Sequence, residues 1–191
     1  DIIRQYKAKG VNVTSEVTVH HLTLTDEACA TYNPATRVSP PLRSWDHVQA
    51  MREAVLDGTV DAIVTDHAPH APEEKDVEFR YAPCGFCGLE TSLGVMLTDL
   101  YHTNIFDLKT IISKMSCEPS KLFKLNRGTL AEGAVADIAI IDLDKEWTVD
   151  SSKFYTRGKF TPYEGKECKG KAVATMLAGK FVMRDGVVCA K

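Results

Sequence analysis

The sequence predicts an α/β fold: the C-terminal part of a (β/α)8 TIM-type barrel over residues 1–126 and a small β-sandwich portion over residues 127–191. In the first two-thirds of the 191-residue chain, two β-branched apolar segments alternate with helical patterns, and each segment leads into a long loop. Such alternation is typical of parallel βα units. A closed barrel needs eight units and about 250 residues, so we expect only its last units here. In the final third, short strand patterns separated by turns predict an antiparallel β unit.

The elements of the barrel part follow in order. Residues 1–10 have the pattern of the last turns of a helix, with a glycine placed as its C-terminal cap. Alternating β-branched residues predict a strand over 11–19. A helix over 44–58 has a serine N-cap and a glycine stop, and the apolar run at 60–65 predicts the second strand.

Further helices and the β-rich portion complete the chain. Helical patterns cover residues 89–103 and 106–115, and a short helix is expected over 118–125. In the β-rich portion, turns are expected at Glu132-Gly133 and Asp185-Gly186. These turns predict an antiparallel arrangement of short strands.

Composition and charge exclude several classes of protein. The hydrophobic content of 44% and the charged content of 26% are typical of a soluble globular protein. The net charge of -3, without a basic stripe, predicts no nucleic-acid partner. No apolar stretch approaches the ~20 residues that span a bilayer, and no signal segment is apparent, so we expect no membrane partner. The six scattered cysteines indicate reduced thiols and a cytoplasmic location.

Polar residues gather where the second predicted strand ends. Asp66 follows the apolar run directly, and His70 lies four residues further on. In parallel βα units, ligands bind beyond the carboxyl ends of the strands. A carboxylate at that position can ligate a metal or act as a base, but it fits an N-cap or turn before Pro69 equally well. His70 could meet the same ligand or be an ordinary loop histidine.

Two other pairs of residues allow more than one interpretation. His20 and His21 are adjacent, so on a strand they would point to opposite faces and at most one would face a ligand. Cys84 and Cys87 have a zinc or redox spacing, yet no second such pair exists in the chain. The glycines beside these cysteines fit better a loop whose backbone closely approaches another group.

The sequence resembles the C-terminal half of type I dihydroorotases of the amidohydrolase superfamily. The match covers nearly the whole chain. Its most specific stretch is 65–75, at the end of the second predicted strand, which contains Asp66 and His70. The matching stretches follow the family's order and spacing: EVTVHHLTLTDE (16–27), SPPLRS (39–44), TDHAPHAPEEK (65–75), YAPCGFCGLETSL (81–93), GTLAEGAVADIAIIDL (128–143) and FTPYEGKECKGKAVATMLAGKFVMRDG (160–186).

The resemblance implies an activity and the residues that support it. Dihydroorotases reversibly cyclise N-carbamoyl-L-aspartate to dihydroorotate in pyrimidine biosynthesis, with one or two zinc ions. Asp66 matches the aspartate that binds zinc and acts as general base and acid. His70 matches a histidine suited to hold the substrate carboxylate, and Ala82, Cys84 and Gly85 match loop positions beside the pyrimidine ring.

The chain departs from the family's pattern in two respects. Ser39 stands where the family usually has an asparagine that contacts the substrate, and serine lacks an amide that donates and accepts together. The family's other metal ligands, a His-x-His, a carboxylate or modified lysine and two histidines, come from earlier strands that are not in this sequence. The chain is therefore expected to be a fragment that needs the missing N-terminal half for a complete zinc site.

Three functional readings remain open on the sequence. The first is a dihydroorotase piece, and the second is a non-catalytic relative that supports a partner such as aspartate carbamoyltransferase. The third is a related cyclic amidohydrolase, hydantoinase or allantoinase, although the HAPH with a following Glu-Lys favours dihydroorotase. The exposed strand flanks of a partial barrel also predict a homo-oligomer or a partner-bound chain.

Overall fold

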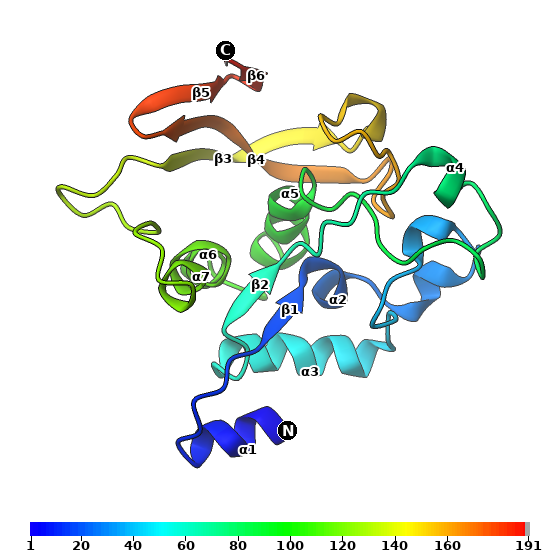
Figure 1. Cartoon of the computed structure of the whole chain (residues 1–191), viewed down its shortest axis with the longest axis horizontal. Helices are drawn as coiled ribbons and strands as arrows, with labels where there is room; N and C mark the ends of the chain where they lie inside the picture. The colour runs from blue at the N-terminus through cyan, green and yellow to red at the C-terminus, as the bar shows by residue number, and fades with distance from the viewer. Residues whose placement is uncertain (190–191) are drawn as a thin grey trace.

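A short parallel sheet lies at the centre of the first part of the chain. The computed structural model describes residues 1–189, and residues 190 and 191 of the predicted β-sandwich portion lie outside the described residues. Strands β1 (Glu16–Thr18) and β2 (Ala62–Val64) pair in parallel. Helix α3 (Trp45–Leu56) connects them through the loop that precedes it (Figure 1). This is the βα arrangement that the sequence predicts, although the closed barrel itself remains a prediction.

The first strand is shorter than the predicted 11–19, because residues 11–15 form no strand and a helix begins at the last residue of the predicted strand. Val19 begins α2 (Val19–Thr23), and the Thr18 hydroxyl accepts a hydrogen bond from the His21 backbone N–H at 3.2 Å. A threonine N-cap of this kind stabilises the first turn of a helix. His20 and His21 therefore lie on a helix and not on a strand, and, as expected, only one of the two, His21, lines the cavity described below.

Helix α3 confirms its predicted bounds. Ser44 is the N-cap, and Gly58 follows the helix with a φ of +81°, a conformation that glycine adopts without strain. Val48 and Val55 face the core, with exposed fractions of 2% and 1%. Met51, which the helical pattern places on the same face, is 36% exposed and instead lines the cavity described below.

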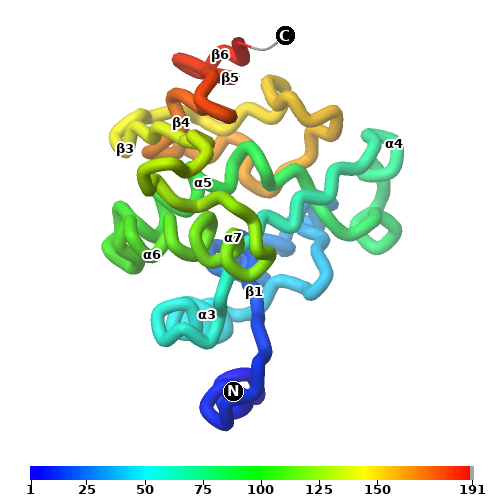
Figure 2. Tube along the Cα trace, turned by 60° about the vertical axis from the view of Figure 1, so that its left-hand side comes forward, coloured from blue at the N-terminus to red at the C-terminus, as the bar shows by residue number. Residues whose placement is uncertain are grey.

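Helices are present at the three predicted places, 89–103, 106–115 and 118–125, but the second and third form one continuous stretch. The first contains α5 (Ser92–Met96) and a wider turn η3 (Leu97–Tyr101). The continuous stretch contains α6 (Leu108–Ile112), η4 (Ser113–Cys117) and α7 (Glu118–Leu122), as Figure 2 shows. The remaining short helices are α1 (Ile2–Ala8), η1 (Asp26–Cys29), η2 (Pro34–Thr36), α4 (Pro72–Lys75) and η5 (Ser151–Lys153). No helix formed by residues 1–189 is long and apolar enough to cross a membrane.

The β-rich portion is a single antiparallel sheet over the described residues. Its strands are in sequence order across the sheet: β3 (Ile138–Thr148), β4 (Glu167–Leu177), β5 (Lys180–Arg184) and β6 (Val187–Val188). The antiparallel pairing is as predicted, but up to residue 189 there is one sheet instead of the two layers of a β-sandwich. The Asp185-Gly186 turn joins β5 to β6, whereas Glu132-Gly133 lies in the loop before β3.

The sheet packs closely on the helix that follows β2. Figure 1 shows β3 and β4 above α5. A Cβ added at Gly94 would lie 2.5 Å from the Trp147 ring, and one added at Gly170 would lie 2.5 Å from Leu97 Cδ1. The Trp147 indole N–H donates to the Gly170 carbonyl at 3.0 Å. The two parts of the chain therefore share one apolar core. This core fixes the position of the parallel strands β1 and β2 relative to the antiparallel sheet.

Candidate functional site

A cavity of about 580 Å³ lies against the carboxyl ends of the two parallel strands. It brings together side chains from three separate segments of the sequence, 16–21, 39–51 and 64–66. Those that carry polar groups are Glu16, Thr18, His21, Ser39, Arg43, His47 and Asp66. The cavity is thus at the place where parallel βα units bind ligands, as the sequence predicts.

Asp66 lies two residues beyond β2 and lines this cavity. Its φ of +49° is a left-handed conformation that aspartate adopts more readily than most residues. It is not an N-cap, because α4 begins at Pro72 with Ala71 as its N-cap. Among the hydrogen bonds and ion pairs of residues 1–189, none involves the Asp66 carboxylate. The carboxylate is therefore not used to hold the loop and is available to a ligand.

His21 anchors the loop that carries Ser39. Its Nε2 lies 3.1 Å from the Pro40 carbonyl oxygen, and its Nδ1 lies 2.7 Å from Thr18 Oγ1. Because a carbonyl oxygen only accepts, Nε2 carries the proton and donates, and Nδ1 accepts from the Thr18 hydroxyl. Ser39, the position of the family's asparagine, is thereby held at the cavity wall opposite the strands.

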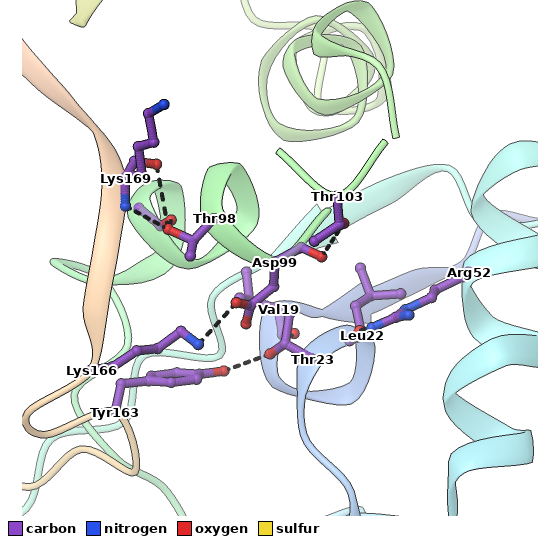
Figure 3. A network of polar contacts seen from close by, with 11 residues as sticks. Val19, Leu22, Thr23, Arg52, Thr98, Asp99, Thr103, Tyr163, Lys166 and Lys169 are labelled. Carbon is purple, nitrogen blue, oxygen red and sulfur yellow. Dashed lines mark hydrogen bonds and ion pairs between the residues drawn. The ribbon is translucent and has the colours of Figure 1, made fainter. Parts of the chain in front are cut away.

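Helix α2, which presents His21, is fixed by polar contacts on two sides (Figure 3). The guanidinium of Arg52 on α3 donates from Nε and Nη2 to the Leu22 carbonyl at 2.9 and 2.8 Å. On the other side, the Thr23 hydroxyl donates to the Val19 carbonyl and lies 2.9 Å from Tyr163 Oη. Burial raises the pKa of Tyr163, so its hydroxyl keeps its proton and donates to Thr23.

His20 lies behind the cavity in the apolar core. Its side chain is 1% exposed, and its ring lies edge-on to Phe86 with 5.1 Å between centroids. Within residues 1–189, neither ring nitrogen has a hydrogen-bond partner. Burial, together with the neighbouring His21, lowers the pKa of His20 to about 3. His20 is therefore neutral at neutral pH and belongs to the core, whereas His21 faces the cavity.

The buried His20 predicts a loss of stability in mild acid. The folded-state pKa of about 3 lies below the usual value of 6.5, so below pH 6.5 the unfolded chain binds a proton that the folded chain does not. Stability from this group is complete above pH 6.5 and falls by about 1.4 kcal/mol per pH unit between pH 6.5 and 3. Urea unfolding at several pH values should show a shallower dependence for His20→Phe than for wild type. Equal slopes would contradict the account.

The loop after Pro83 lies beside the segment that carries Asp66. The Ala68 N–H donates to the Phe86 carbonyl at 3.0 Å, and His70 Nε2 lies 3.0 Å from the Cys84 carbonyl oxygen. Gly85 has a φ of +119°, and a Cβ there would lie 2.5 Å from Ala68 Cβ. This close approach of two backbones explains the glycine better than a zinc ribbon does.

The predicted site residues separate into two adjacent groups. Ser39 and Asp66 line the cavity, whereas His70, Cys84 and Gly85 form a second cluster beside it. The two groups are linked, because the Gly85 N–H donates to the Arg37 carbonyl at 2.9 Å, two residues before Ser39.

Ala82 lies beneath the loop, where its groups have partners within the protein. Its side chain is fully buried, and its carbonyl accepts a hydrogen bond from the Arg37 guanidinium. Its N–H donates to the Glu78 carbonyl at 3.1 Å. The substrate contact that the resemblance implies for Ala82 stays a prediction.

Lys75 holds the Pro83–Gly85 loop through hydrogen bonds, a role that the sequence analysis did not predict. Its side chain is fully buried, and its ammonium donates to the carbonyls of Pro34, Pro83 and Gly85 at 2.7, 2.9 and 2.8 Å. The only signal in the sequence was a lysine next to the polar cluster, and its burial depends on contacts between distant loops.

The residues present fit a partial metal site only. Among residues 1–189, no group of three or more His, Cys, Asp or Glu side chains could hold a metal ion. Cys84 is exposed while Cys87 is buried, and burial raises the pKa of the Cys87 thiol, which disfavours a metal-binding thiolate. Asp66 supplies one carboxylate at the end of β2, which fits one ligand of a zinc ion.

Comparison with known proteins supports a hydrolase. The dihydroorotase of Pelotomaculum thermopropionicum is 47% identical over 98% of this chain and 44% of its own length. The dihydroorotase of Citrifermentans bemidjiense is 50% identical over 95% of this chain and 42% of its own. The chain thus spans less than half the length of these curated relatives.

A solved structure has the same fold over the whole chain. The L-hydantoinase (dihydropyrimidinase) of Arthrobacter aurescens superposes with a TM-score of 0.94 at 32% identity, over 100% of this chain and 43% of its own. It supports the α/β fold of a metal-dependent hydrolase. The profile of the amidohydrolase family matches residues 1–182. The chain therefore belongs to the amidohydrolase family.

Proposed function

We propose that the protein carrying this chain is a dihydroorotase, which interconverts dihydroorotate and N-carbamoyl-L-aspartate in pyrimidine biosynthesis. The observation that carries the proposal is the Asp66 carboxylate, which lines a cavity at the strand ends and makes no contact that the fold requires. The dihydroorotases that are 47–50% identical over nearly the whole chain support this choice of substrate. The cytoplasm is the compartment we propose.

Asp66 would carry the proton during hydrolysis. Its carboxylate takes a proton from the attacking water, whose oxygen bonds to the ring carbonyl carbon. As the ring C–N bond breaks, the same group delivers the proton to the leaving nitrogen, and the new carboxylic acid releases the second proton of the water to solvent and becomes a carboxylate. Ring closure reverses these steps. Proton transfer by a positioned group of this kind contributes about 10²–10⁴-fold to a rate.

The second cluster would bind the substrate. His70 lies beside the Cys84 carbonyl at the loop, where its imidazole could hold the substrate carboxylate. Gly85 lets the loop lie directly against the Ala68 segment and beside His70, because no side chain stands between them. Ser39, presented by the loop that His21 anchors, would reach the ring from the other wall.

Zinc is the metal we propose for this site, with Asp66 as one ligand. When bound, zinc supplies a Lewis acid that polarises the scissile carbonyl and makes water more acidic. A complete set of ligands would need residues from outside 1–189, because no group of three or more His, Cys, Asp or Glu side chains within them could hold the ion. We further propose a homo-oligomer or an assembly with aspartate carbamoyltransferase, which sedimentation with and without that enzyme would test.

Substrate comparison tests the proposed function. The protein, expressed at its natural length with zinc, should hydrolyse dihydroorotate with a kcat/KM at least ~100-fold above that for hydantoin or allantoin, because only dihydroorotate offers a carboxylate to His70. Preference for hydantoin would instead indicate a hydantoinase, like the structurally similar L-hydantoinase of Arthrobacter aurescens. Absence of hydrolysis of all three would favour a non-catalytic module.

Ser39 is the residue that favours the non-catalytic alternative, and its replacement is informative. Ser39→Asn restores an amide that donates and accepts together, so we expect KM for dihydroorotate to fall about 10-fold, the effect of one hydrogen bond to a charged or polar group. Steady-state kinetics would measure this change, with Ser152→Asn, on an exposed turn far from the cavity, as the matched control. An unchanged or higher KM would mean that Ser39 does not contact the substrate.

A further inference from the structure

The loop of Pro83, Cys84 and Gly85 is hydrogen-bonded to the buried ammonium of Lys75. All three donors of the Lys75 ammonium are used, and all three acceptors are backbone carbonyls. Among the ion pairs of residues 1–189, none includes Lys75. A buried ammonium is costly unless its hydrogen bonds are complete, so the loop and the lysine stabilise each other.

The hydrogen bonds of Lys75 determine how the loop is turned. The carbonyls of Pro83 and Gly85, on either side of Cys84, both point inward to the ammonium. The Cys84 carbonyl, which lies between them in the sequence, has a different partner: its oxygen is 3.0 Å from His70 Nε2. The Cys84 side chain is exposed. An alternation of carbonyl directions over three residues is thus fixed by one side chain.

The same lysine joins two loops that reach the site. Its third acceptor, the Pro34 carbonyl, belongs to η2, and this loop continues to Arg37, whose carbonyl accepts from the Gly85 N–H at 2.9 Å. The Arg37 guanidinium donates to the Ala82 carbonyl. The hydrogen bonds of Lys75 and Arg37 to this part of the chain go to main-chain carbonyls, which carry no net charge. The positive charge of the two side chains therefore favours an anionic ligand at the loop.

We propose that Lys75 is a positioning residue, which sets the backbone of Pro83–Gly85 for binding an anionic substrate. This inference rests on the proposed function for the identity of the substrate, but the geometry of the loop can be tested without it. Burial also lowers the pKa of Lys75, in keeping with an ammonium that has no acidic partner.

Replacement of Lys75 by Met tests the proposal in the protein at its natural length. Methionine keeps an apolar stem and leaves three carbonyls without a donor. Hydrogen exchange followed by mass spectrometry should become at least ~10-fold faster in peptides covering residues 80–88, while peptides covering 93–101 stay unchanged. KM for dihydroorotate should rise at least ~10-fold, with a smaller change in kcat. Lys75→Arg should give intermediate values of both quantities.

Lys114→Met is the matched control, because the Lys114 ammonium also donates to a backbone carbonyl, that of Val60, on the N-terminal side of β2. It should leave KM and the exchange of residues 80–88 unchanged. Exchange that rises equally in all peptides of Lys75→Met, or stays at the wild-type rate, would overturn the positioning role.

The proposal can still be tested if Lys75→Met does not fold or if the wild-type protein has no dihydroorotase activity. If Lys75→Met does not fold, faster exchange confined to residues 80–88 in Lys75→Arg supports the proposal, and wild-type exchange there overturns it. If wild-type protein lacks dihydroorotase activity, the proposed function fails, while the exchange experiment still decides whether Lys75 sets the loop.

Discussion

Replacing Asp66 by Asn is expected to lower kcat for dihydroorotate hydrolysis by about 10³-fold or more. Asparagine has nearly the same shape but cannot accept the proton of the attacking water or return it to the leaving nitrogen. Because the carboxylate makes no contact that the fold requires, the free energy of unfolding should stay within about 0.5 kcal/mol of the wild-type value. Kinetics and urea unfolding on the same preparation would measure both quantities.

Asp26→Asn provides the matched control for that variant. Asp26 is exposed in the loop between β1 and β2 and does not line the cavity. Its replacement makes the same chemical change and should leave kcat unchanged. If Asp66→Asn kept more than about a tenth of the wild-type kcat, Asp66 would not be the group that transfers the proton.

Gly85→Ala is expected to cost about 2–5 kcal/mol of unfolding free energy, the largest stability effect at the site. The added Cβ would lie 2.5 Å from Ala68 Cβ and 3.1 Å from the Ala68 carbonyl oxygen, both on the segment that carries Asp66. The φ of +119° is also one that alanine rarely adopts. Substrate binding should weaken in parallel, because the loop must move away from His70.

Gly165→Ala separates steric contact from backbone strain. Gly165 also has a positive φ, +73°, but nothing lies within 4 Å of an added Cβ. Its replacement should therefore cost only about 1 kcal/mol, from the backbone alone. Chemical denaturation of both variants would give the comparison, and equal losses would show that the contact with Ala68 relaxes without cost.

Local patterns were sufficient to predict the elements whose cause is local. Helix α3 follows from a serine cap and a terminal glycine, and the antiparallel β-rich portion follows from short strand patterns with turn dipeptides. The position of Asp66 at a strand end also follows from sequence, because an apolar run that stops at a carboxylate is visible without the fold.

Features that depend on distant contacts could not be predicted in this way. Helix α2 has a local threonine cap at Thr18, but it is also held by Arg52, which reaches the Leu22 carbonyl from thirty residues away. The burial of Lys75 requires three carbonyls that meet only after two loops fold together. Neither arrangement leaves a periodic signal in the chain.

A crystal structure of the protein at its natural length with bound dihydroorotate would show whether Asp66 and the Cys84-Gly85 loop form the substrate site. We expect the ring between Asp66 and this loop, with the substrate carboxylate on His70 and the scissile amide beside the Asp66 carboxylate. Dihydroorotate bound elsewhere, for example in the apolar groove between α6 and β3, without contact to Asp66, would contradict this expectation.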